Sequence, residues 1–159
     1  AWGAATEDYP LKGWKKVIDV NVTGTFLCSQ IVGRSMIGEG KGKIINLSSV
    51  FGTVGAPSNV MDAVAYNTSK GAVEALTKDL AVMWAKHQIC VNTIAPSFIE
   101  TDLTRETMQK GGKHILDLVP MRRFGVPADL KGAVIFLSSA ASDYITGTTI
   151  YVDGGYRAM

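Results

Sequence analysis

The sequence predicts an α/β fold in which a parallel sheet carries helices on both faces. Residues 43–49 and 89–95 are short apolar runs without strict alternation, which is typical of strands buried on both sides. Residues 148–152 form a third such run. Longer segments with helical spacing of apolar residues lie between these strands, and this order implies right-handed crossovers between parallel strands.

The first two thirds of the chain alternate regularly between helix and strand signals. Residues 12–37 have a helical pattern, although Gly24 and Gly33 leave open two shorter helices. A glycine-rich loop precedes the strand at 43–49, and residues 50–62 read as a second loop. A long helix is predicted over 63–87. The strand at 89–95 stops at Pro96, which cannot donate to a ladder.

The remaining part begins with a long polar excursion over residues 97–126, of the kind that often forms a lid. A short helix is predicted over 104–110, ended by Gly111 and Gly112. Pro127 starts another helix, which runs to about residue 138. The last strand, residues 148–152, is followed by a turn at 153–155.

Three strands are few for such a sheet, and nothing before residue 43 offers a neighbour to that apolar strand. An exposed apolar edge is a liability, so we predict that residues 1–159 are the C-terminal, catalytic part of a larger doubly wound domain. The chain starts with Ala1 rather than Met, which suggests missing upstream residues. A phosphate-binding glycine motif after a strand is not visible, and we expect it in the N-terminal half outside this chain.

Composition narrows the class of function. Hydrophobic residues make up 47% of the chain and charged residues 19%, which suits a folded core. The net charge of +2 comes without a basic stripe, so we expect no nucleic-acid partner. No apolar run approaches the ~20 residues that cross a bilayer, so we expect no membrane partner.

The cysteines and histidines do not indicate a metal site. Cys28 and Cys90 lie in apolar segments without CxxC spacing, which predicts buried free thiols in a reducing compartment and therefore a cytoplasmic location. His87 and His114 stand alone, so a structural metal is not expected.

Tyr66 and Lys70 are the most informative pair, because residues four apart on a helix face each other. A free tyrosine has a pKa near ~10, and a nearby positive charge favours the phenolate. This pair therefore predicts a tyrosine with a lowered pKa that acts as an acid/base. The ordinary alternative is a half-exposed tyrosine beside a solvated lysine.

Other polar residues are predicted at the same sheet edge, because ligands of open parallel sheets bind beyond the carboxyl ends of the strands. Ser49 follows the first strand, and Thr101 lies in the segment after the second. Each has a structural alternative: Ser49 could satisfy backbone groups, Thr101 could cap a helix, and Asn21 could be a packing residue in its helix.

Several ordered stretches resemble the short-chain dehydrogenase/reductase family, of the compact single-domain type. The matching stretches are Asp19-Val20-Asn21-Val22-Thr23-Gly24, Ile45-Asn46-Leu47-Ser48-Ser49, Tyr66-Asn67-Thr68-Ser69-Lys70-Gly71, Val91-Asn92-Thr93-Ile94-Ala95-Pro96 and Tyr144-Ile145-Thr146-Gly147 with Val152-Asp153-Gly154-Gly155. They follow the family's order and span nearly the whole chain. The resemblance implies the C-terminal half of a Rossmann-like sheet and an NAD(P)-dependent oxidoreductase.

The resemblance also implies catalytic roles. Tyr66 is similar to the residue that exchanges a proton with the substrate oxygen, and Ser49 to the hydroxyl that polarises the substrate alcohol or carbonyl. Ser49 is preferred to Ser48 because Val50-Phe51-Gly52 follows it, as after the family's serine. Lys70 is similar to the lysine that lowers the tyrosine pKa and binds the nicotinamide ribose. Asn21 resembles the residue whose backbone fixes a water linked to the lysine.

The cofactor implied is NAD or NADP, and hydride transfer is that cofactor's own chemistry. Its carboxamide is expected to bind the turn that contains Pro96, Ile99 and Thr101. The family usually has glycine after the proline, whereas this chain has Ser97, whose side chain could crowd the cofactor or narrow the backbone choices. The spacing from Ser49 to Tyr66 is also longer than usual, with the added residues at 56–62 beside the expected substrate pocket.

Other functions stay open at this point. The chain could be a non-catalytic fragment or scaffold that cannot bind cofactor alone, or an epimerase or dehydratase relative. Relatives of this form assemble as homodimers or homotetramers, and the Ala-rich helix at 63–87 fits a buried interface. That apolar surface could instead cover the missing half of the sheet.

Overall fold

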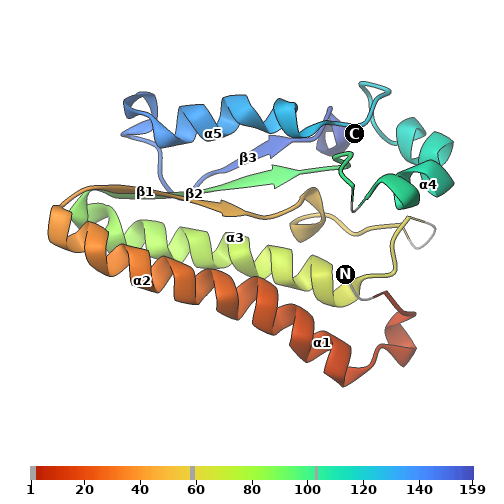
Figure 1. The fold of residues 1–159 in the computed structure, drawn as a ribbon, viewed down its shortest axis with the longest axis horizontal. Coiled ribbons are helices and arrows are strands. Elements are labelled where there is room, and N and C mark those ends of the chain that lie inside the picture. Colours follow the sequence, from red (N-terminus) through yellow and green to blue (C-terminus); the bar gives the residue numbers. More distant parts are fainter. Residues whose placement is uncertain (1–2, 58–59, 103) are drawn as a thin grey trace.

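A computed structural model describes residues 3–57, 60–102 and 104–159, and it contains one parallel sheet (Figure 1). The strands are β1 (Gly42–Leu47), β2 (Ile89–Pro96) and β3 (Thr149–Val152), in the order β1-β2-β3. Both pairings are parallel, which confirms the predicted α/β architecture. The carboxyl ends of β1 and β2 therefore open onto the same edge.

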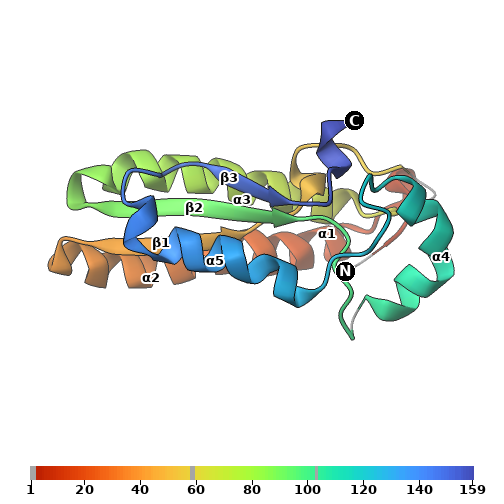
Figure 2. The same cartoon turned by 90° about the horizontal axis from the view of Figure 1, so that it is seen from above.

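Helices cover both faces of this sheet, as predicted. The helices α2 (Gly24–Glu39) and α3 (Val64–Trp84) lie on one face, and α5 (Lys131–Ser138) lies on the other (Figure 1). Seen from above, α3 runs along the β2–β3 side and α2 along the β1 side (Figure 2). This layering places the first turn of α3 beside the carboxyl end of β1.

The predicted helix over 12–37 is one continuous helical segment with a change of winding in its middle. The helix α1 (Leu11–Ile18) passes into a π-helical turn at Asp19–Thr23 and then into α2. Neither Gly24 nor Gly33 interrupts it. Asn21 lies inside the π turn, and such turns occur frequently at functional sites.

The segment after β2 differs from the prediction. Its helix α4 (Arg105–Asp117) continues through residues 111 and 112 instead of ending there. Met108 and Ile115, two turns apart, are both buried in the same apolar cluster. Burying two large side chains stabilises a helix by about 1.5–3 kcal/mol each, which offsets the cost of about 1 kcal/mol for each internal glycine.

The apolar core consists of two clusters, one near each end of the sheet. The cluster at the carboxyl end contains Phe51, Phe98, Met108 and Ile115, and three of its aromatic rings, Phe51, Phe98 and Tyr156, meet edge to face. The second cluster packs α2 and α3 against β1 and β2 around Ile44, Ala81, Ile89 and Val91. The first cluster thereby joins α4 to the loop that follows β1.

The two thiols differ. Cys90 is buried in β2 as predicted, but Cys28 lies on the exposed side of α2, so the prediction of a buried thiol is wrong there. Its flanking apolar residues Phe26 and Leu27 are themselves 41% and 47% exposed. An apolar stretch of sequence thus forms an uncovered surface of α2.

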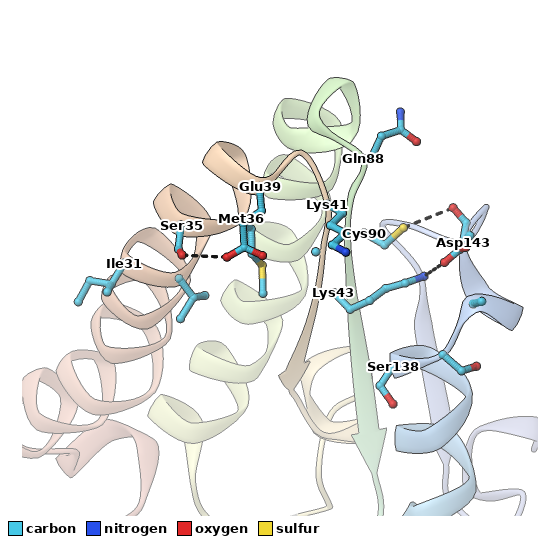
Figure 3. Close-up of a pocket in the computed structure, with 14 residues that line it drawn as sticks. Ile31, Ser35, Met36, Glu39, Lys41, Lys43, Gln88, Cys90, Ser138 and Asp143 are labelled. Carbon is cyan, nitrogen blue, oxygen red and sulfur yellow. Dashed lines mark hydrogen bonds and ion pairs between the residues drawn. The ribbon is translucent and has the colours of Figure 1, made fainter.

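The outer edge of β1 has no strand beside it among the described residues. A pocket of about 740 Å³ lies at this edge between α2 and the end of α5 (Figure 3). Lys43 crosses it to Asp143, with its Nζ 2.8 Å from the carboxylate. This hollow lies at the amino ends of the strands, away from Ser49 and Tyr66.

Candidate active site

Ser49 and Tyr66 meet where β1 ends and α3 begins. Tyr66 lies in the first turn of α3, with its phenol near enough to the Ser49 hydroxyl for that hydroxyl to lower the pKa of the phenol. Both side chains are largely covered, since Ser49 is 5% exposed and Tyr66 is partly buried. The structure therefore brings together two residues that are 17 positions apart in the sequence.

Ser49 has a defined backbone environment. Its hydroxyl oxygen accepts a hydrogen bond from the Phe51 amide at 3.3 Å, as the cap of a short 3₁₀ turn at Val50–Gly52. The same hydroxyl lies 3.5 Å from the Pro96 carbonyl at the end of β2. Ser48, in contrast, turns toward α3, where its hydroxyl lies 2.9 Å from the Lys70 carbonyl oxygen.

Two glycines allow the turn that follows Ser49 to touch the backbone of α3. A Cβ on Gly52 would lie 2.8 Å from the Lys70 carbonyl carbon, and a Cβ on Gly71 would lie 2.9 Å from the Gly52 carbonyl oxygen. Side chains at either position would push the turn and the helix apart. This backbone contact holds the serine turn directly against the segment that carries Tyr66 and Lys70.

Lys70 lies on the same side of α3 as Tyr66. Its Nζ is 5.5 Å from the centroid of the Tyr66 ring and donates a hydrogen bond to the Leu47 carbonyl at 2.9 Å. Burial lowers the pKa of the Lys70 ammonium, because desolvation disfavours the charged form. The ammonium has three donors, and the Leu47 carbonyl occupies one.

The pKa of Tyr66 moves opposite to the sequence prediction. Burial raises the pKa of the phenol, and the hydrogen bond with Ser49 lowers it by a smaller amount. A lowered pKa was expected from Lys70. The Lys70 ammonium lies over the Tyr66 ring, however, and is hydrogen-bonded to the Leu47 carbonyl. Tyr66 is therefore held as a neutral phenol, which is the form that donates a proton.

Asn21 is connected to α3 through its side chain. Its Nδ2 donates a hydrogen bond to Ser69 Oγ at 2.9 Å, and Ser69 immediately precedes Lys70. The backbone carbonyl of Asn21 accepts a hydrogen bond from Thr25 Oγ1 at 2.7 Å. The π turn thus packs Asn21 beside the helix segment that contains Lys70.

The three residues predicted to bind the carboxamide lie at and just after the end of β2. Pro96 is the last residue of that strand. Ile99 pairs with Gly125 across the base of the 97–126 segment. The Thr101 hydroxyl lies 3.0 Å from Thr104 Oγ1 and accepts a hydrogen bond from the Thr104 amide at 3.3 Å. These bonds hold the Thr101 hydroxyl against Thr104, the N-cap residue of α4, which itself has no side-chain capping bond within the described residues.

The departure at Ser97 has a structural explanation. Its hydroxyl donates a hydrogen bond to the Asp153 carbonyl at 3.1 Å, and the backbone of Ser97 does not have a positive φ. The backbone here does not require glycine. Ser97 contributes instead to a pocket of about 350 Å³ at the carboxyl ends of β2 and β3.

In the longer spacing between Ser49 and Tyr66, residues 58 and 59 lie outside the described residues.

The sequence reasoning missed Glu74, a buried acid on the same side of α3 as Lys70. Glu74 is 5% exposed and is contacted by hydroxyls of Ser48, Thr149 and Tyr151. A charged residue four positions after Lys70, flanked by Ala72, Val73, Ala75 and Leu76, was the available signal. Its contacts connect α3 to β1 and β3.

Two broader expectations concern metals and membranes. Within residues 3–57, 60–102 and 104–159, no three His, Cys, Asp or Glu side chains gather as a metal site. Over the same ranges, every helix is too short or too polar to span a bilayer.

The chain is similar to dehydrogenases. Residues 2–157 match the family model described as enoyl-(acyl carrier protein) reductase. The chain is 43% identical to the 2-dehydro-3-deoxy-D-gluconate 5-dehydrogenase of Dickeya dadantii, with 95% of this chain and 59% of that protein covered. It is 40% identical to the galactitol 2-dehydrogenase (L-tagatose-forming) of Cereibacter sphaeroides, over 90% of this chain and 56% of that protein.

Solved structures have the same fold. A gluconate 5-dehydrogenase from Burkholderia cenocepacia, in complex with NADP and tartrate, superposes with a TM-score of 0.93 at 36% identity. That comparison covers 99% of this chain and 61% of the other. A short-chain type dehydrogenase/reductase from Mycobacterium marinum gives the same TM-score and coverage at 38% identity. The chain thus spans about three fifths of the length of these proteins.

Proposed function

Because the chain belongs to the short-chain dehydrogenase/reductase family, we propose that it supplies the catalytic part of an NAD(P)-dependent oxidoreductase that acts on an alcohol or ketone. The observation that carries this proposal is the contact between Ser49 and Tyr66 beside Lys70, at the carboxyl ends of β1 and β2. Polyols and sugar acids are the substrates to test first, since relatives with over 35% identity are named for both.

The residues fit a nicotinamide cofactor. Among the described residues the Lys70 ammonium is bonded to the Leu47 carbonyl, which leaves two of its donors for ribose hydroxyls. The turn with Pro96, Ile99 and Thr101 would hold the carboxamide. When bound, the cofactor supplies or accepts the hydride. NAD and NADP both remain candidates, and a relative's structure contains NADP.

Proton transfer is assigned to the chain's own side chains. In reduction, the Ser49 hydroxyl donates a hydrogen bond to the substrate carbonyl oxygen and Tyr66 gives its proton to that oxygen. In oxidation, the Tyr66 phenolate takes the alcohol proton. Asn21 is assigned the family role of fixing a water that connects Lys70 to solvent. A neutral Tyr66 suits the reductive direction, because general acids must be protonated.

The open edge of β1 supports the proposal that further residues complete the domain. A parallel strand paired with β1 would fill the hollow beside Lys43 and cover Ile31, which is 66% exposed on α2 (Figure 3). We also propose a homodimer or homotetramer, because Val82 and Met83 at the end of α3 are 76% and 66% exposed. The free thiols fit a cytoplasmic location.

The test is Tyr66→Phe in the full-length protein, assayed with NAD(H) and NADP(H) against gluconate, galactitol and glycerol. Turnover is expected to fall about 10²–10⁴-fold, the usual contribution of a general acid/base, while cofactor affinity changes little. Tyr144→Phe is the matched control, since Tyr144 is fully exposed. Unchanged turnover in Tyr66→Phe would remove this residue from the mechanism.

The alternative is a non-catalytic fragment or scaffold. Titrating the 159-residue chain with NADPH, monitored by nicotinamide fluorescence, separates the two readings of the chain. We expect weak binding by this chain alone and tight binding by the full-length protein. Tight binding by the chain alone would contradict the need for additional residues.

A further inference from the structure

Polar side chains fill part of the interface between α3 and the sheet. Glu74 is the acid among them, and its two carboxylate oxygens contact different strands. Oε1 lies 3.1 Å from Ser48 Oγ, directly after β1. Oε2 lies 3.3 Å from the Tyr151 hydroxyl and 3.4 Å from Thr149 Oγ1, both on β3. The carboxylate therefore links α3 to both outer strands, across β2.

A carboxylate at this depth requires donors. Burial of an unpaired ion is strongly unfavourable, whereas hydrogen bonds to the charged form compensate it. No ion pair of Glu74 occurs among the residues that the structure describes. The three hydroxyls are therefore its stabilising partners, although Ser48 shares its single proton between Glu74 and the Lys70 carbonyl at 2.9 Å.

This position is directly connected to the catalytic contact. Glu74 lies one turn after Lys70 and two turns after Tyr66 on one side of α3, where residues four apart are neighbours. Its partner Ser48 is covalently next to Ser49. One contact thus connects the helix that presents the phenol to the turn that presents the serine hydroxyl.

We propose that Glu74 is a positioning residue, whose carboxylate holds the Ser48–Ser49 turn and α3 in the arrangement where the Ser49 hydroxyl meets the Tyr66 phenol. This inference rests on the function proposed for Ser49 and Tyr66. Glu74 touches no reacting atom in this scheme. Its effect reaches the reaction through Ser48 and through the rotation of α3 about its axis.

The neighbouring Thr77 gives a matched comparison. Its hydroxyl lies 2.9 Å from Asn46 Nδ2 and 2.9 Å from Thr93 Oγ1, so it joins α3 to β1 and β2. Thr77 is as buried as Glu74, but its hydroxyl bonds within the described part of the chain are to Asn46, Val73 and Thr93 and not to Ser48. Loss of the Thr77 hydrogen bonds should lower the free energy of unfolding without moving the serine turn.

The experiment measures the Tyr66 phenol directly. Full-length protein is labelled with ¹³Cζ-tyrosine, the Tyr66 signal is assigned with Tyr66→Phe, and its pKa is titrated by NMR. In Glu74→Ala the Ser48 hydroxyl keeps its bond to the Lys70 carbonyl but loses Glu74, so the Ser49 interaction should weaken and the pKa of Tyr66 should rise by about 0.4–1 units, at most the equivalent of one hydrogen bond. Glu74→Gln keeps an acceptor for Ser48 and should leave the pKa within about 0.3 units.

A purely electrostatic effect has the opposite sign. Removing a negative charge near a phenol stabilises the phenolate, so both Glu74 variants would then lower the pKa of Tyr66. That result, or no change in Glu74→Ala, would overturn the proposal. Thr77→Val and Asp79→Asn, an exposed acid on the same helix, should leave the pKa of Tyr66 unchanged.

Ser48→Ala provides the second variant if Glu74→Ala does not fold. It removes the Glu74 contact from the other partner, together with the Ser48 bond to the Lys70 carbonyl, and should raise the pKa of Tyr66 by at least a similar amount. An unchanged value would contradict the proposal. Where turnover is measurable, kcat should fall about tenfold in Glu74→Ala with little change in KM, and recover in Glu74→Gln. Turnover that survives Tyr66→Phe would refute the proposed function, while the NMR result would still decide the role of Glu74.

Discussion

The two faces of the sheet are held by different kinds of interaction. On the α3 face, hydrogen bonds between buried side chains connect the helix to all three strands, through Glu74 and Thr77. In α5 itself, Leu137 is buried, while Ile135 is 67% exposed. Polar side chains on this face of the sheet bond segments beyond α5: Lys43 contacts Ser142 and Asp143, and Asn92 is hydrogen-bonded to the backbone of Ile145 and Thr148.

This difference matters for function because apolar contact is non-directional, whereas hydrogen bonds depend on angle. A helix packed only by apolar side chains can rotate or slide slightly at low cost. The bonds of α3 to the strands oppose such movement, and α3 is the helix that carries Tyr66 and Lys70. Chemistry that depends on a contact between two hydroxyls is thus placed on the more rigidly oriented face.

The largest expected difference between the two faces comes from replacing one glycine on each face by alanine. In Gly71→Ala the new Cβ would lie 2.9 Å from the Gly52 carbonyl oxygen, so the serine turn must move. We expect a loss of about 1–3 kcal/mol in the free energy of unfolding, as for overpacked sites, and a clear fall in turnover. Denaturant unfolding of the full-length protein gives the first value.

Gly132→Ala in α5 is the matched substitution, because a Cβ there would meet nothing within 4 Å among the described residues beyond its own turn of helix. Alanine is favoured over glycine in a helix by about 1 kcal/mol, so this variant should be slightly more stable. Equal destabilisation by both substitutions would contradict the difference between the two faces.

A smaller effect is expected from Ser49→Ala, which tests the polar contact on the α3 face through pH. The Ser49 bond lowers the pKa of Tyr66, so its removal should raise that pKa further. The pH midpoint of alcohol oxidation, which needs the phenolate, should move up by about 0.4–1 units. The alkaline loss of the reductive rate, which needs the phenol, should move in the same direction.

Ser97→Ala is the control for this profile. Its hydroxyl bonds the Asp153 carbonyl and is not a cause of the Tyr66 shift. The pH midpoint of alcohol oxidation by Ser97→Ala should stay at the wild-type value. A profile of Ser49→Ala that overlies the wild type would show that the serine hydroxyl does not set the phenol's acidity.

Local pattern was sufficient to predict the parallel strands and the helices between them. The apolar runs at 43–49 and 89–95 correspond to Gly42–Leu47 and Ile89–Pro96, and the third strand was placed within one residue. These predictions succeeded because strand burial and helical periodicity are properties of adjacent residues. Membership of the family was also predicted from the ordered motifs, and the comparisons confirm it.

Features that depend on distant contacts were not predictable in the same way. The helix α4 continues past its glycines because Met108 and Ile115 reach a core built by other segments. Cys28 is exposed because this side of α2, with Phe26 and Leu27 at 41% and 47% exposure, is left largely uncovered by the described residues. The pKa of Tyr66 rises because the effect of burial exceeds that of the Ser49 hydroxyl, and burial cannot be read from residue spacing. Glu74 was missed for the same reason.

The smallest effect is expected at the entry to α5, where the polar contacts are on the surface. The Asp129 carboxylate accepts two hydrogen bonds from Arg123, at 2.7 and 3.0 Å, and one from the Val126 amide. The Arg123 guanidinium is the main cause that lowers the pKa of Asp129 from 3.8 to about 2. A carboxyl group whose pKa is lowered by folding stabilises the fold at pH values above its unfolded pKa. This stabilisation is lost as the pH falls through the folded pKa.

Asp129→Asn should therefore lower the melting temperature slightly at neutral pH, and the difference from wild type should shrink between pH 4 and pH 2. Added salt should shrink it too, because exposed charges are screened. The comparison is the melting temperature of both proteins across this pH range. A difference that stays constant down to pH 2 would mean that Asp129 acts through packing, and the entry to α5 would then resemble the α3 face more closely than its exposed contacts indicate.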